Sequence, residues 1–146
     1  MKRYSFPLAQ VLQVRRLEED RAAGQLASAQ VQAAAAEEQV TRRRAALAGM
    51  AAPAGVGTAE TFLAWHQGVA LAGDALTVAG VARQVARAEV DARRAEWSAA
   101  AMRVSALERL DQRRFEAHRK EARRTEAVQV DDMVTARRGR SREMHP

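Results

Sequence analysis

The stretch LAQVLQVRRLEEDRAAGQLASAQVQAAAAEEQVTRRRAAL, residues 8–47, decides the fold because its apolar residues recur at alternating spacings of four and three. An average step of 3.5 residues is the period at which one α-helix keeps the same side turned toward another. Nine of the twelve positions on this ladder are apolar; the full set is Leu8, Leu12, Arg15, Glu19, Ala22, Leu26, Ala29, Ala33, Ala36, Val40, Arg43 and Leu47. The stretch therefore predicts a long helix that pairs with a second helix.

A second ladder with the same step follows, and twelve of its fourteen positions are apolar: Phe62, Trp65, Val69, Ala72, Leu76, Ala79, Arg83, Ala86, Val90, Arg93, Trp97, Ala100, Val104 and Leu107. Two such ladders predict an all-α fold, a long antiparallel two-helix coiled-coil hairpin that forms a single domain over residues 1–146. Because a hairpin encloses almost no interior, its function is expected on its surface and at its ends. The charged ladder residues either fix the register of the pair or extend their head groups to water.

Breaker residues set the expected boundaries. Pro7, a residue favoured at the first helical position, begins a helix over about 6–49, and the Gly- and Pro-dense segment 49–57 is the loop. Thr58 is a natural N-cap for a second helical region over 58–138. Glycines at positions 68, 73 and 80 predict a bend or break within 73–80, which would leave a short extra helix near the tip. The basic tail, residues 139–146, is expected to fray.

Charge is concentrated toward the two ends of the chain. The net charge is +6 overall, and it divides into +3 over residues 1–50, −1 over residues 51–100 and +4 over residues 101–146. A hairpin brings both basic ends together, which suggests an acidic partner there. The alternative is that mixed Arg and Glu side chains merely solvate long helices.

Nothing in the sequence indicates an enzyme, a metal site or a cofactor. The chain has no Cys, and none of its three His residues belongs to a metal-binding arrangement: Glu121 lies three residues after His118, but no second pair faces it. The segment Gly55–Gly57 lacks the Lys and the preceding strand of a phosphate loop. The N-terminus does not read as a signal peptide, and no window approaches the ~18–20 apolar residues of a membrane span, so the chain is expected to be cytoplasmic.

One cluster of large side chains follows the loop. Phe62, Trp65 and Val69 share one face, where they either seal the tip of the hairpin or anchor a partner.

Both ends of the chain carry motifs that resemble flagellar export proteins of the FliJ family. Phe6–Leu12 with Arg15 and Arg16 is similar to the family's opening F-x-L-x-x-V-L-x-x-R. Ala106–Leu110, followed by an Arg-rich helix and by Val130–Met133, resembles the family's ending. Here Val130 and Asp132 stand where the family usually has Leu and Glu.

The resemblance implies a non-enzymatic, cytoplasmic component of the flagellar type III export apparatus, which is needed for motility and lies peripheral to the membrane at the flagellar base. It implies a stalk that enters the hexameric export ATPase (FliI), contacts the export-gate membrane protein FlhA and handles export chaperones. The residues expected at the ATPase end are Leu8, Leu12, Arg15, Arg16, Val130, Asp131, Met133 and Val134. Those expected on the export-gate side are Phe62, Trp65, His66 and Val69.

Two other functions stay open. One is a generic coiled-coil scaffold or chaperone. The other is nucleic-acid binding, which the isoelectric point of about 11.1 invites. No nucleic acid is expected, however, because the basic residues are interleaved with acids and no aromatic platform accompanies them.

Overall fold

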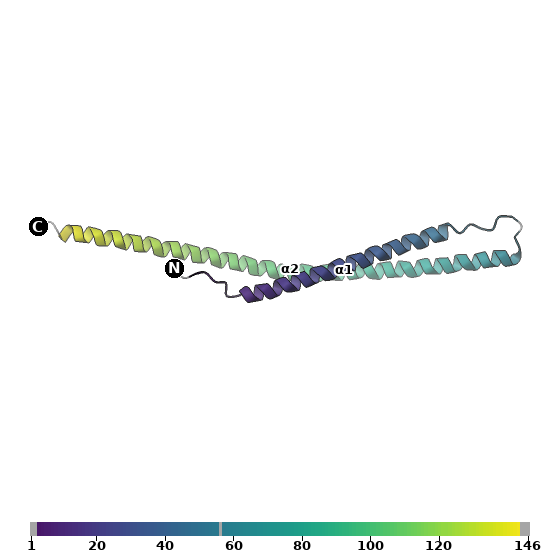
Figure 1. The fold of residues 1–146 in the computed structure, drawn as a ribbon, viewed down its shortest axis with the longest axis horizontal. Coiled ribbons are helices and arrows are strands. Elements are labelled where there is room, and N and C mark those ends of the chain that lie inside the picture. Colours follow the sequence, from purple (N-terminus) through teal and green to yellow (C-terminus); the bar gives the residue numbers. More distant parts are fainter. Residues whose placement is uncertain (1–2, 56, 144–146) are drawn as a thin grey trace. The chain divides into compact units, whose positions relative to one another are not determined.

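The protein is described by a computed structural model that covers the backbone of residues 3–55 and 57–143 and the side chains up to residue 137. These residues form two helices, α1 (Ala9–Ala48) and α2 (Ala59–Glu143), and no strand (Figure 1). The predicted all-α helical hairpin is confirmed. The predicted helix boundaries, 6–49 and 58–138, lie within three residues of the observed ends except at the C-terminus of α2, which extends further.

Contacts divide the chain into two units, and each contains a part of both helices. The terminal unit comprises Met1–Arg16 with Met102–Pro146, and the loop unit comprises Leu17–Ala101. In the loop unit Arg93 bonds to Gln25, and Arg83 bonds to Glu37. Residues later in α1 therefore meet residues earlier in α2. This order means that the two helices of the loop unit run antiparallel.

The predicted ladders are the faces on which the two helices pack. Eleven of twelve positions on the first ladder and twelve of fourteen on the second are buried or half-buried; the exposed ones are Arg43, Phe62 and Trp97. Most residues between these positions are exposed. The 3.5-residue period therefore predicted the packing faces correctly.

The packed interior is thin because Ala fills much of it. In the terminal unit Phe6, Leu12 and Val104 form a buried cluster, with Tyr4, Leu8, Leu107 and Leu110 packed against it. No large side chain among the described residues is fully buried. Since hydrophobic stabilisation scales with buried apolar area, at roughly 25 cal/mol per Å², many small contacts hold the helices together.

Charged ladder residues make bonds between the helices of the loop unit. Glu37 accepts hydrogen bonds from Arg83 at 3.3 Å and from Arg87 at 2.8 Å. Arg93 bonds across to Gln25 and along its own helix to Glu89 and Glu96. Polar groups at such positions disfavour shifted pairings, because a shift would leave them half-buried without partners.

The predicted break within 73–80, and with it the short extra helix near the tip, is wrong. α2 runs without interruption through Gly73 and Gly80, and the Thr77 hydroxyl donates to the Gly73 carbonyl oxygen at 3.0 Å within the helix. A helical Gly costs only about 1 kcal/mol relative to Ala. Between the two glycines, the ladder residues Leu76 and Ala79 are half-buried. Packing therefore outweighs the low helix propensity of glycine here.

α2 is helical as far as Glu143, five residues past the predicted end of the helical region, and the fraying of the tail stays a prediction. Residues 144–146 lie outside the described residues.

The loop begins and ends as its residue types predict. Thr58 caps α2: its Oγ1 accepts a hydrogen bond from the Thr61 backbone N–H at 3.2 Å, and Glu60 lies in the first turn. Gly55 has a φ of 92°, a left-handed conformation that side chains with a Cβ rarely adopt.

One expectation about membranes needs correction. The portion of α2 between Ala59 and Arg137 contains an 18-residue window with a mean hydropathy of 1.2, which by length and composition would suffice to cross a membrane. Its Ala, Val and Leu residues raise the hydropathy, and Asp74 is the one charged residue in the segment 68–82. One such window, in a helix whose ladder face packs against another helix, is weak support for a span.

The continuity of α2 predicts how its glycines respond to substitution. A Cβ added at Gly73 or Gly80 meets no atom within 4 Å outside its own helical turn. Gly73→Ala and Gly80→Ala should each raise the free energy of unfolding by about 0.5–1 kcal/mol, measured by urea titration of the helical signal. The matched control, Gly55→Ala, should lower it because of the left-handed backbone at that position. Loss of stability in both α2 variants would contradict a continuous helix.

Candidate partner-binding surfaces

The N-terminal segment is held on α2 by an aromatic cluster in the terminal unit. The Tyr4 hydroxyl donates to Asp111 Oδ1 at 2.7 Å. The Tyr4 ring lies 5.3 Å from the Phe115 ring, nearly edge-on, and 5.5 Å from the His118 ring, measured between centroids. Arg119 places its guanidinium over Phe115. These contacts fix where the segment before α1 meets α2.

The hydroxyl of Tyr4 loses its proton at a higher pH in the folded protein than in the unfolded chain. Its pKa is raised above the usual 10, first by desolvation and then by the hydrogen bond and the negative charge of Asp111. The neutral phenol is thus the form that the fold favours. Since the pKa is raised in the folded state, this contribution to stability is present below pH 10 and is lost as the pH rises through the folded pKa.

The predicted ATPase-end residues of α1 and the segment before it are mostly used in packing. Leu12 is buried and Leu8 and Arg15 are half-buried, whereas Arg16 is exposed. Arg16 donates to Glu108 at 2.8 Å in an ion pair. Leu8 and Leu12 therefore stabilise the hairpin, and Arg16 is the member of this group that a partner can reach.

The predicted ATPase-end residues of α2 lie elsewhere. Val130, Asp131, Met133 and Val134 are exposed, as is every described residue from 123 to 137. They do not lie beside Leu8 and Leu12, because those two residues pack in the cluster with Val104, Leu107 and Leu110. The terminal unit thus does not bring the two halves of this predicted site together.

Helix length explains the separation. α1 has 40 residues and α2 has 85. The contacts of Tyr4 reach along α2 to His118. The α2 segment 119–137, named the overhang here, has one half-buried residue, Ala122.

One side of the overhang combines basic and apolar residues. Lys120, Arg123, Ala127, Val130 and Val134 follow one another at steps of three and four, so they share one side of the helix. Met133 adjoins this side, and Asp131 lies at its edge. An exposed apolar patch preceded by positive charge is typical of a protein-binding helix.

The predicted export-gate residues lie at the start of α2. Phe62 and His66 are exposed, whereas Trp65 and Val69 are half-buried in the packing face. The Phe62 and Trp65 rings lie 5.7 Å apart. The Trp65 Nε1 is buried and has no hydrogen-bond acceptor among the described residues. The cluster therefore both seals the loop end of the packing face and exposes an aromatic ring.

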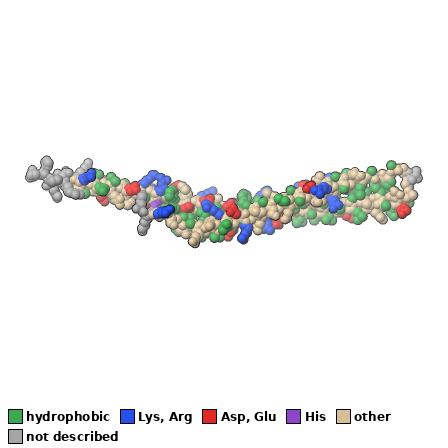
Figure 2. All heavy atoms as spheres, in the orientation of Figure 1, with side chains coloured by type: hydrophobic (Ala, Val, Ile, Leu, Met, Phe, Trp, Pro, Cys, Tyr) green, Lys and Arg blue, Asp and Glu red, His purple; other side chains and the backbone are tan. Residues whose placement is uncertain are grey.

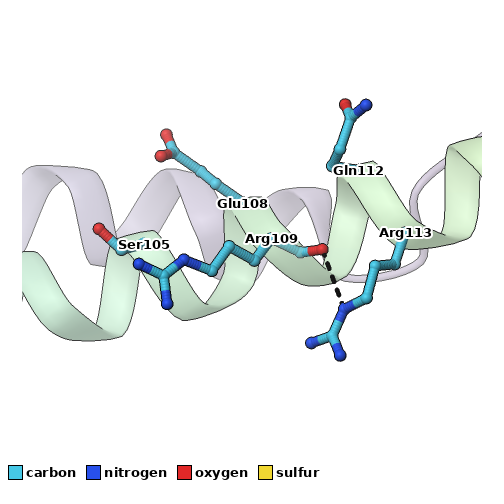
Figure 3. A pocket seen from close by; sticks show the side chains of 5 residues that line it. All are labelled: Ser105, Glu108, Arg109, Gln112 and Arg113. Atoms are coloured by element: carbon cyan, nitrogen blue, oxygen red, sulfur yellow. Dashed lines mark hydrogen bonds between the residues drawn. The ribbon is translucent and has the colours of Figure 1, made fainter.

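The surface offers no enclosed reaction site in the described part of the chain. Blue, red and green side chains alternate along the visible face in Figure 2, as expected for interleaved Arg, Glu and apolar residues. The hollow in Figure 3 is open, and all of its lining residues come from one helix: Ser105, Glu108, Arg109, Gln112 and Arg113. No group of three metal-ligating side chains occurs among the described residues.

Sequence reasoning missed the Tyr4 cluster. Tyr4 precedes the helical ladder, and its partners Asp111, Phe115 and His118 belong to a region that reads as polar. The available signal was the position of Tyr4, the only Tyr of the chain, shortly before the ladder begins.

Because the chain has one Tyr, its titration can be read directly. The tyrosinate absorbance of the native protein should rise at a higher pH than that of the protein unfolded in urea. Asp111→Asn removes the negative charge and should move the native midpoint toward the unfolded one. Identical midpoints for native and unfolded protein would show that Tyr4 does not hold this contact.

Comparison with known proteins agrees with the resemblance that the motifs suggested. The family model described as flagellar FliJ protein matches residues 4–143, which is nearly the whole chain. Neither a curated protein nor a solved structure matches it. The match includes the opening motif, both helices and the overhang. With two long paired helices and this match, the chain belongs to the FliJ family and is a helical protein of flagellar export.

Proposed function

We propose that the protein is a non-enzymatic stalk of the flagellar export apparatus, which enters the ring of the export ATPase with the overhang. The observation that carries the proposal is that α2 continues for nineteen described residues, 119–137, beyond the contacts of the N-terminal segment. At 1.5 Å per residue this single helix is about 28 Å long. A single helix is narrower than the pair that precedes it, so it suits insertion into a central opening.

The chemistry of the overhang supports a protein partner. Its segment 119–124 carries four basic residues and one acid, and the apolar side chains of Val130, Met133 and Val134 follow. Exposed apolar side chains provide binding energy, and basic residues steer the helix toward an acidic surface. Arg16 lies exposed in the same unit, although its ion pair with Glu108 must be kept or exchanged on binding.

The loop end of α2 is the proposed contact for the export gate. Phe62 is a large exposed ring, and it is supported from one side by Trp65. Rigid aromatic residues are common centres of binding energy in interfaces. His66 is exposed beside them. The proposal places the protein at the cytoplasmic face of the membrane at the flagellar base, where it also meets export chaperones.

A generic scaffold remains the second candidate function. A scaffold would use the same paired helices and would not need the overhang. Substitutions in the overhang should therefore impair a stalk but leave a scaffold unaffected.

Substitution of Val130 tests the stalk. Val130→Glu places a charge in the exposed patch without disturbing the packing face, so its helical content should stay unchanged. The concentration of the variant that gives half-maximal stimulation of purified export ATPase should rise at least about tenfold, because binding would bury a carboxylate without a partner. Val31→Glu, on an equally exposed site of α1, is the matched control and should behave as the unchanged protein. Equal activity of both variants would argue against the proposal.

Substitution of Phe62 tests the gate contact. Phe62→Ala should weaken binding to the cytoplasmic domain of the export-gate protein by about tenfold or more, as expected for a central aromatic anchor. Leu63→Ala is the matched control, since Leu63 is as exposed as Phe62 but lies about 100° around the helix. Calorimetric titration measures both affinities. An unchanged affinity for Phe62→Ala, in a folded protein, would remove Phe62 from the contact.

A further inference from the structure

A third apolar ladder runs along the outer side of α2, away from the face that packs on α1. Its positions are Leu71, Asp74, Val78, Val81, Val85, Ala88, Ala92, Ala95 and Ala99, which again alternate between steps of three and four after Leu71. All nine are exposed, and the large ones are strongly so: Leu71 is 70% exposed, Val78 69% and Val85 65%. We call this set the outer stripe.

The outer stripe differs from an ordinary solvent-facing side. On α1 the equivalent outward positions are interrupted by Arg21, Ser28, Glu38 and Arg42. On α2 the stripe contains one charged residue, Asp74, in nine positions. Contiguous exposed apolar residues usually mark an interaction site, and a 3.5-residue period indicates that the occupant is another helix.

We propose that the outer stripe is where two copies of this chain associate, through their α2 helices in antiparallel orientation. The order of side-chain sizes supports this occupant, because the large residues lie in the first half of the stripe and the Ala residues in the second. An antiparallel pair centred between positions 86 and 87 places one large and one small residue in each layer: Val78 with Ala95, Val81 with Ala92, and Val85 with Ala88. Each layer then has the same size, so the helix axes stay equally far apart.

A parallel pair fits less well in packing. It would place Val opposite Val at one end and Ala opposite Ala at the other, which demands a different axis separation at each end. The antiparallel pair also places Asp74 opposite Ala99, at the edge of the interface rather than at its centre.

The charges beside the stripe favour the same orientation. Glu89, Asp91 and Glu96 flank it. In the antiparallel pair Glu89 meets Ala82, Asp91 meets Gln84 and Glu96 meets Ala75, so no like charges approach. In a parallel pair Asp91 of one copy would lie beside Glu96 of the other, on both sides of the interface, which destabilises a coiled coil.

These acids also argue against a lipid surface as the occupant. Helices that lie on membranes carry Lys and Arg directly beside their apolar face. Here the positions directly beside the stripe (75, 77, 82, 84, 89, 91, 96 and 98) hold three acids and no base, and the four Arg residues of this stretch lie further around the helix.

The size of the interface sets the expected strength. The stripe and its flanking positions amount to roughly eighteen residues per copy, slightly below the 20–30 residues of a standard interface. We therefore expect the dimer to have a dissociation constant of about 1–10 µM. The inference does not depend on the proposed stalk function, since the overhang and the stripe lie on different parts of α2.

Sedimentation equilibrium of the full chain, over about 0.5–200 µM, should show a monomer that converts to a dimer. Val85→Glu should raise the dissociation constant at least about tenfold, since each dimer would hold two unpaired carboxylates at its centre. Val31→Glu on α1 is the matched control and should leave the constant unchanged. A monomer at every concentration, or equal weakening by both variants, would overturn the proposal. The proposal would also be overturned if the protein formed no dimer but bound vesicles of phosphatidylcholine and phosphatidylglycerol, and Val85→Glu abolished that binding.

Cross-linking tests the orientation, because the chain has no Cys of its own. When Val78→Cys and Ala95→Cys proteins are mixed and oxidised, mass spectrometry should find the disulfide that joins position 78 to position 95. Homodisulfides alone would overturn the antiparallel arrangement.

Discussion

The packing of two ladders of small apolar residues is the constraint on which the other features of this protein depend. Because the ladders repeat every 3.5 residues, each helix turns one side toward its partner, and the polar bonds of Glu37, Arg83 and Arg93 oppose a shift of that pairing. The first helix has fewer than half as many residues as the second. Once the register is set near the loop, part of α2 must therefore remain without a partner helix.

The same constraint distributes stability unevenly. Ala-rich packing buries little area per residue, and exposed ion pairs such as Arg42 with Glu38 contribute at most about 1 kcal/mol. The larger buried side chains gather in the terminal unit, where Phe6, Leu12 and Val104 pack together and Tyr4 closes the cluster. The packing of α1 and of the N-terminal segment at this point sets where the overhang begins.

Much of the fold was predictable because helix pairing leaves a regular trace in the sequence. The ladders correctly predicted 23 of 26 packing positions (eleven plus twelve), and Thr58 correctly predicted the start of α2. The break at Gly73 and Gly80 was predicted wrongly, because a local preference of about 1 kcal/mol per residue was weighed without the packing that opposes it.

The candidate site was harder to predict than the fold. Leu8 and Leu12 were expected at one end together with Val130, Met133 and Val134, but which residues meet is decided by the register and the length of each helix, not by composition. Tyr4 was missed because it lies outside the periodic region, and its bond to Asp111 joins residues 107 apart in the chain. The family, by contrast, was recognisable from the motifs at both ends, and the match over residues 4–143 agrees with it.

The overhang exists only if the terminal unit has the register described here, and paired cysteines measure that register most directly. In the Cys-free chain, Leu12→Cys combined with Val104→Cys should form an intramolecular disulfide on mild oxidation, because these residues pack in one cluster. Leu12→Cys combined with Val130→Cys should not, because Val130 lies in the overhang. Efficient closure of the second pair and failure of the first would show that α1 reaches the C-terminal part of α2, and would contradict the overhang.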